Sequence, residues 1–176
     1  MPNAESPLTP ALSPTGRGGV KNLLPEGRGL GQGAEREYVS LQYETFEHEA
    51  DIGIRGFGNS LEEAFENAAV ALYSVMMNIG KIAQTEKKVI AVSAPDRELL
   101  LVEWLNALLA LSDIERLVFS KFEVKIEDTI LTGIAWGEPL DRVRHEAHVE
   151  VKGATYHMLS VREEGGRYWA QCVVDV

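Results

Sequence analysis

The sequence has little cysteine and no long apolar run, and each scarcity excludes a class of protein. Its 176 residues contain one cysteine, Cys172, which excludes an internal disulfide and a metal site built from several thiolates. No apolar run reaches the roughly 18 residues that a membrane-spanning helix requires, so we expect no membrane insertion. The N-terminus lacks the basic and apolar regions of a secretory signal peptide. We therefore expect a cytoplasmic protein.

Basic residues are also scarce. The chain has 17 lysines and arginines against 27 aspartates and glutamates, which gives a formal net charge of −10. Tight binding to nucleic acid requires a surplus of basic residues to neutralise phosphates, so we expect no such binding by this chain alone. The acidic balance is instead compatible with a cation ligand or a basic partner protein.

The common catalytic motifs are absent. The sequence contains no P-loop, no dinucleotide-binding glycine motif and no GxSxG nucleophile elbow. The four histidines, at positions 48, 145, 148 and 157, do not have the spacing of a helical zinc site. With one cysteine and scattered histidines, the ligand set suits a transition metal poorly.

The composition changes sharply near Ala34. Residues 1–34 hold five of the seven prolines and seven of the sixteen glycines, and they lack apolar periodicity. Such a segment cannot bury enough surface to offset its ordering entropy, so we predict a disordered N-terminal extension. The extension resembles translated intergenic repeat DNA, which raises the hypothesis of a mis-assigned start codon, and a functional tail is the alternative. Residues 35–176 are predicted to form one domain.

Hydrophobic periodicity in this domain predicts an α+β fold. A capping-box spacing, Ser60 to Glu63, begins a predicted amphipathic helix that ends near Asn78, and Pro95-Asp96 begins a central core helix. Alternating patterns predict strands over 38–46, 52–57, 88–94, 117–127, 130–136, 148–161 and 168–174. We expect a curved, largely antiparallel, barrel-like sheet with two packed helices. Trp104, Trp169 and Cys172 are assigned to the core.

Carboxylates are the strongest candidates for chemistry. The segment 44–51 carries four acidic residues and ends on Asp51, where a strand is predicted to begin. A solvated acidic turn is the simple explanation. The chain, however, ends on a strand-like run with Asp175 and the free carboxylate of Val176. Neighbouring oxygen anions of this kind suit Ca²⁺, Mg²⁺ or Mn²⁺. Sequence physics alone leaves open whether Asp51 and Asp175 meet in space.

Several segments together resemble the archease family. The match begins at His48-Glu-Ala-Asp-Ile-Gly-Ile54 and continues through residues 58–78, 99–109 and 150–161 to the terminal Val-Val-Asp-Val. The segments occur in the family's order and span about Tyr38 to Val176. Glu49 replaces the more usual threonine, Gly153 stands where alanine is common, and residues 1–34 have no counterpart.

The resemblance implies a function, a ligand and a set of site residues. It implies an accessory protein that activates an RtcB-type RNA ligase, promoting guanylylation and multiple turnover in tRNA splicing or RNA repair. It also implies calcium binding, with Asp51, Asp175 and the Val176 carboxylate as ligands. The family fold, a barrel-like antiparallel sheet with two helices, agrees with the pattern above.

Three further residues are weaker candidates. The resemblance favours a partner-facing or phosphate-facing role for Lys152, although a strand lysine ordinarily faces solvent. His48 and His157 are assigned the same role. Two other functions stay open: an independent metal-dependent hydrolase or phosphotransferase with Lys152 as electrophile, and a general chaperone, which would require an exposed apolar patch.

Overall fold

The computed structural model describes residues 41–176 as an α+β fold with two helices and only antiparallel strand pairing. The prediction of disorder for residues 1–34, and the first residues of the predicted strand 38–46, lie outside the described residues. Among residues 41–176, no helix is long and apolar enough to cross a membrane.

The strands form two sheets rather than one. The five-stranded sheet has the order β1-β2-β8-β6, and β7 also pairs with β8. Its strands are β1 (Tyr43–His48), β2 (Asp51–Gly58), β6 (Gly153–Ala154), β7 (Ser160–Glu164) and β8 (Arg167–Asp175). The three-stranded sheet has the order β3-β5-β4, with strands β3 (Glu86–Ser93), β4 (Leu117–Glu127) and β5 (Ile130–Pro139). The predicted α+β class is confirmed, with the antiparallel strands divided into these two layers.

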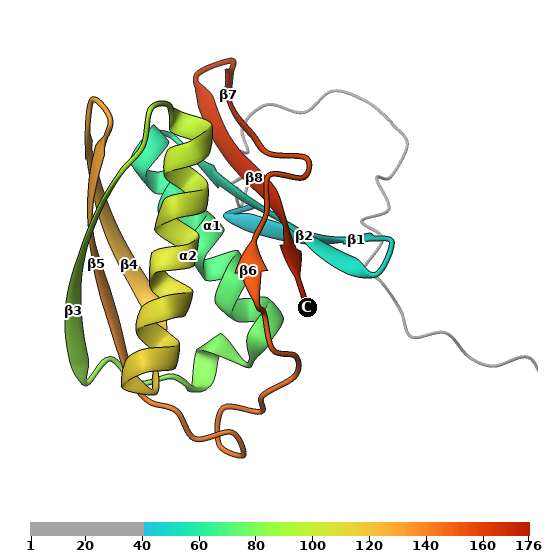
Figure 1. Cartoon of the computed structure of the whole chain (residues 1–176), viewed down its shortest axis with the longest axis vertical. Helices are drawn as coiled ribbons and strands as arrows, with labels where there is room; N and C mark the ends of the chain where they lie inside the picture. Colours follow the sequence, from blue (N-terminus) through green and yellow to red (C-terminus); the bar gives the residue numbers. More distant parts are fainter. Residues whose placement is uncertain (1–40) are drawn as a thin grey trace, which may run out of the picture. The chain divides into compact units, whose positions relative to one another are not determined.

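Two helices lie between the sheets and fill the core (Figure 1). Helix α1 (Leu61–Met76) contacts β2, β8 and β4, and helix α2 (Arg97–Glu115) contacts strands of both sheets. A short 3₁₀ helix, η1 (Ile79–Lys81), follows α1. The largest fully buried side chains are aromatic: Trp104, Tyr73, Phe65 and Phe119. The core helix predicted after Asp96 is therefore confirmed, and so is the assignment of Trp104.

The N-terminal cap of α1 follows the predicted capping box with one change of partner. The Ser60 hydroxyl accepts the backbone N–H of Glu63, as expected. The Glu63 carboxylate reaches one residue further back than the motif requires and accepts the N–H of Asn59 at 2.6 Å. Two hydrogen bonds, one accepted by Ser60 and one accepted by Glu63, thus stabilise the junction between β2 and α1.

The predicted strand 148–161 differs from the structure. Gly153–Ala154 pairs there as β6, and the chain then turns. In this turn the Leu159 N–H donates to the Tyr156 carbonyl at 3.3 Å, and Met158 has φ 50°. The chain resumes pairing with β8 as β7, from Ser160. The alternating pattern covers residues that run alongside β8. The turn breaks their pairing with β8, but the alternation of apolar and polar residues continues through it.

A buried carboxylate, Glu138, anchors the loop that leads to β6. Glu138 is 7% exposed and accepts from the Ala83 N–H at 2.6 Å, from Arg144 at 2.6 Å and from His145 at 3.0 Å. The His145 Nδ1 accepts the Asp141 N–H, so the neutral ring carries its proton on Nε2 and donates it to Glu138. The backbone of His148 donates to Met76 at the end of α1. These bonds fix the loop immediately before Lys152.

Glu138→Gln tests this anchor through its pH dependence. The Arg144 guanidinium, the Ala83 N–H and His145 lower the pKa of the Glu138 carboxyl from 4.5 to about 2. Because the folded-state pKa is depressed, the stabilisation is present above the unfolded pKa and is lost as the pH falls towards 2. Urea unfolding should therefore show a stability gap between wild type and variant that is full at pH 7 and shrinks between pH 4.5 and 2. A stability difference between wild type and Glu138→Gln that does not change with pH would contradict this explanation. Glu103→Gln, which changes an exposed carboxylate on α2, is the control.

Gly56→Ala tests the close approach of β2 and α1. A Cβ on Gly56 would lie 2.2 Å from both the Ala64 carbonyl oxygen and the Ala68 nitrogen, which are backbone atoms of α1. Because backbone cannot move aside as a side chain can, we expect a loss of about 1–3 kcal/mol in the free energy of unfolding. Gly80→Ala is the matched control, since its Cβ would meet only Asn78 Oδ1 at 3.4 Å. Equal urea midpoints for the two variants would refute the packing argument.

Candidate functional site

The five-stranded sheet has an inner face on α1 and an outer face away from the helices. Alternation places Ile54 of β2 and Cys172 of β8 on the inner face, both fully buried. Burial raises the pKa of the Cys172 thiol to about 12, so this cysteine is a small core residue, as predicted, and not a thiolate ligand. The residues that alternate with these inner residues along β2 and β8 lie on the outer face. They include Asp51, Arg55 and Asp175.

The strand register places Asp51 next to Asp175. Strands β2 and β8 are antiparallel with Ile52 opposite Val174, so the next positions are Asp51 and Asp175. On the other side of β2, His48 pairs with Asp51 across the β1–β2 turn. Directly opposite residues in such ladders have Cα atoms about 4.5–5.5 Å apart. The register continued by one residue thus brings Asp51 and Asp175 to neighbouring backbone positions at the ends of adjacent strands, and a shared ligand role for their carboxylates stays a prediction.

Lys152 supplies the positive charge at this end. Its backbone N–H donates to the Asp175 carbonyl at 2.8 Å, which aligns the chain before β6 with the end of β8. Its Nζ donates to the main-chain oxygen of Val176 at 2.9 Å and lies 3.6 Å from Asp175 Oδ1. The side chains of Lys152 and Asp175 are 64% and 52% exposed, so this ion pair contributes little to stability.

The two histidines of this end contact each other. Nε2 of His48 lies 3.1 Å from Nε2 of His157, and the rings meet edge to face at 4.5 Å between centroids. Such a contact requires one donor and one acceptor, so one proton is held between the facing nitrogen atoms. The backbone of His157 accepts the Val173 N–H at 3.0 Å, which fixes the turn after β6 against β8.

The six residues predicted for the site lie near one end of the five-stranded sheet: His48, Asp51 and Asp175 belong to its outer face, and Lys152 contacts Asp175 and Val176 from the chain before β6. Their roles stay predictions. We call this group the C-terminal cluster: His48, Asp51, Lys152, His157, Asp175 and Val176. Figure 1 marks the C-terminus at the end of β8, beside β6 and β2.

The donor set of the C-terminal cluster suits a hard cation. Among residues 41–176, no group of three or more His, Cys, Asp or Glu side chains is placed to hold a metal ion. The ligands that the family resemblance implies, namely Asp51, Asp175 and the main-chain carboxylate of Val176, therefore stay a prediction. Oxygen anions without a soft ligand fit Ca²⁺ or Mg²⁺, and they leave several coordination positions for other groups. The Lys152 ammonium lies among the same oxygens and partly neutralises them in place of a cation.

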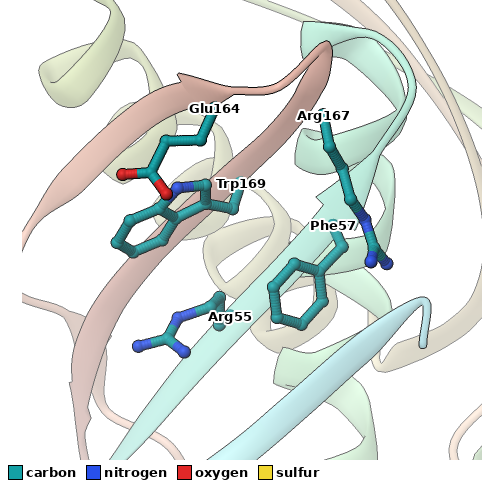
Figure 2. Close-up of a pocket in the computed structure, with 5 residues that line it drawn as sticks. All are labelled: Arg55, Phe57, Glu164, Arg167 and Trp169. Carbon is teal, nitrogen blue, oxygen red and sulfur yellow. The ribbon is translucent and has the colours of Figure 1, made fainter. Parts of the chain in front are cut away.

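The opposite end of the outer face carries residues that the sequence reasoning missed. A hollow of about 310 Å³ is lined by Arg55, Phe57, Glu164, Arg167 and Trp169 (Figure 2). The assignment of Trp169 to the core is wrong, because Trp169 lies on the outer face, opposite Phe57, and is only partly buried. The sequence contains the signal: Arg-x-Phe at 55–57 and Arg-x-Trp at 167–169 alternate in step on paired strands.

The chain is similar over most of its length to proteins of one family. The model of the Archease protein family matches residues 43–176. The Protein archease of Pyrococcus abyssi is 47% identical and that of Pyrococcus furiosus 49% identical, each over 140 residues, which cover 77% of this chain and 99% of the relative. The solution structure of Methanobacterium thermoautotrophicum protein 1598 is 39% identical, with a TM-score of 0.69, and the match covers 77% of this chain and 99% of that one.

A more distant likeness concerns the fold alone. A crystal structure from Thermotoga maritima, described as an archease and possible chaperone, superposes with a TM-score of 0.54 at 24% identity. The match covers 76% of this chain and 96% of that one.

Proposed function

We propose that this chain, which belongs to the archease family, is a calcium-binding accessory protein that activates an RtcB-type RNA ligase in tRNA splicing or RNA repair. The observation that supports the proposal is the register that brings Asp51 and Asp175 to neighbouring backbone positions, with Lys152 in contact with Asp175 and Val176. Membership of the family supports an accessory role, and the ligase and the metal are the proposed details.

The exposure of the C-terminal cluster favours an accessory protein over an independent hydrolase. An enzyme that acts alone encloses its substrate in a concave and largely apolar site. Here the side chain of Asp175 is about half exposed and that of Lys152 more so. Groups that project from a surface are suited to enter the active site of another protein, where that protein excludes the water. Lys152 lines a hollow of about 410 Å³, but neither Asp51 nor Asp175 does, so the proposed ligands of an independent phosphotransferase are not enclosed with it.

The residues of the cluster have distinct tasks in this proposal. Asp51, Asp175 and Val176 would hold the cation, which when bound supplies positive charge to phosphate oxygens. Lys152 already lies within 4.0 Å of two of these anions and can turn towards an incoming phosphate when a cation replaces it. The contact between His48 and His157 joins β1 to the turn that is bonded to β8, and the proposal gives this pair a partner-facing or phosphate-facing role. Two or three protein ligands leave coordination positions open for the nucleotide or the ligase.

Asp51→Asn and Asp175→Asn test the shared site. Each change removes one anion without changing apolar volume, so each should abolish most of the stimulation of multiple-turnover ligation. The double variant should be little worse than either single one, since residues that act as a unit are non-additive. The assay uses the ligase of the same organism with GTP and a divalent cation, and Asp113→Asn, an exposed aspartate of α2, is the control.

Two outcomes of this assay would count against the proposal. Full stimulation by both single variants would remove the carboxylates from the site. Absence of stimulation by the wild type with its own ligase would remove the accessory function itself.

Calcium binding by the chain alone supplies a second test, independent of the ligase. Lys152→Gln removes the ammonium that competes with a cation for Val176 and Asp175, so the calcium affinity should rise several-fold. An added residue after Val176 moves the terminal carboxylate away and should lower the affinity. Both are measured by calorimetry at fixed ionic strength. If the extended chain binds calcium as the wild type does, Val176 is not a ligand.

A further inference from the structure

The end of the outer face opposite the C-terminal cluster gathers arginine and aromatic side chains. We call this set the Arg–aromatic patch: Arg55, Phe57, Arg162, Arg167 and Trp169. Its residues come from β2, β7 and β8, which pair side by side. Figure 2 shows the aromatic rings and the guanidinium groups around the hollow. Three arginines on one face are a local positive surplus in a chain of net charge −10.

The patch is ordered before any partner binds. The guanidinium of Arg55 lies 4.9 Å from the centre of the Trp169 ring, and that of Arg162 lies 5.4 Å from it. Arg55 also donates to Gln171 at 2.7 Å and forms an ion pair with Glu44. The guanidinium of Arg167 lies 4.8 Å from the Phe57 ring. Side chains fixed in this way lose little entropy on binding, and exposed tryptophan and arginine are the residues most enriched in interface hot spots.

Two of the arginines keep charge available for a partner. Within residues 41–176, no carboxylate oxygen lies within 4.0 Å of the guanidinium groups of Arg162 and Arg167. Arg162 donates to the Ser160 hydroxyl at 2.9 Å, and Arg167 donates to the Leu41 carbonyl. Glu164 lines the same hollow and stands opposite Arg167 in the β7–β8 ladder, so it limits the positive surplus, although its carboxylate forms no ion pair with either arginine among the described residues. A partner protein whose surface is complementary to the patch therefore presents carboxylates to these arginines, around an apolar contact with Trp169 and Phe57.

The patch and the C-terminal cluster lie on one face, within reach of a single partner. Arg55 follows Asp51 by four residues along β2, which corresponds to about 13 Å of strand. Trp169 precedes Asp175 by six residues along β8, or about 20 Å. A protein interface of standard size covers about 800 Å² on each partner, which is enough to include both ends.

We propose that the Arg–aromatic patch is the docking anchor by which this chain holds its partner enzyme. It binds a protein surface that presents carboxylates around an apolar contact and so directs the C-terminal cluster into the partner's active site. This inference rests on the proposed accessory function. Single-stranded RNA is disfavoured as the occupant, because the net charge of −10 repels phosphates and two guanidinium groups already lie over the ring on which a base would stack.

The test separates docking from activation. Arg162→Glu/Arg167→Glu changes two exposed side chains and should weaken binding to the purified ligase at least tenfold, measured by biolayer interferometry, with calcium binding by the chain alone unchanged. Saturating concentrations of this variant should restore stimulation. Asp51→Asn should show the reverse, with binding close to wild type and no stimulation. Arg142→Glu, an exposed arginine of the 140–152 loop, is the control for added negative charge.

Each outcome decides between the hypotheses. A wild type that stimulates the ligase, together with a double arginine variant that binds as tightly as wild type, overturns the docking anchor and leaves the proposed function intact. A wild type that neither binds nor stimulates overturns the proposed function. If the variant loses affinity only for a single-stranded RNA oligonucleotide, the patch is an RNA site and the docking inference fails. Arg162→Gln/Arg167→Gln, with thermal unfolding by circular dichroism, separates lost contacts from lost folding.

Discussion

The pairing of β2 with β8 is the constraint on which the site depends. These strands are far apart in the chain, and their ladder runs from Ile52–Val174 to Gly58–Tyr168. The same ladder brings Asp175 beside Asp51 and Trp169 beside Phe57. Gly56 and Gly58 permit it to lie directly on α1, since a Cβ at either position would lie 2.2–2.6 Å from backbone atoms of that helix. Strand β8 is thus held in place by its pairing with β2 along one edge and by packing against α1 on its inner face.

The alternation of side chains along β2 and β8 places the residues that stabilise the fold on the inner face and the candidate functional residues on the outer face. Inner residues such as Ile54, Cys172 and Val174 are fully buried and contribute the hydrophobic free energy of the sheet. A shift of the register by one residue would bury Asp51 and Arg55 and expose this core, so the burial of one face fixes the composition of the other. The C-terminal cluster and the Arg–aromatic patch can therefore occupy the outer face at little cost to folding. Both are built from side chains that the core does not use.

The sequence predicts those features that depend on local patterns. The Ser60 cap, the helix after Asp96 and the terminal strand follow from periodicity and capping, which act over a few residues. The division into two sheets is decided by tertiary pairing that periodicity does not encode, and so is the turn at Met158. The local pattern indicates Asp51 and Asp175 as separate candidates, but only the family resemblance implies a shared site and a role for Lys152, because no local rule states that strands so far apart in the chain are neighbours. Trp169 was misassigned because alternation predicts two faces without indicating which one is covered.

The position of the site at the end of the chain has a physical consequence of its own. The candidate ligands of β8 and the residue after it, Asp175 and Val176, are held there by the pairing of β8 with β2 and β6. Chain ends ordinarily fray, and here the backbone of Lys152 and the pairing of β6 with Asp175 hold the end in place. The Lys152 ammonium lies beside Asp175 and Val176 and offsets part of the negative charge there. In the proposed function a cation displaces this ammonium, and it competes only with an exposed ion pair, which is weak. A site whose neutralising group can be exchanged in this way would bind the cation reversibly and share it with the partner protein of that proposal.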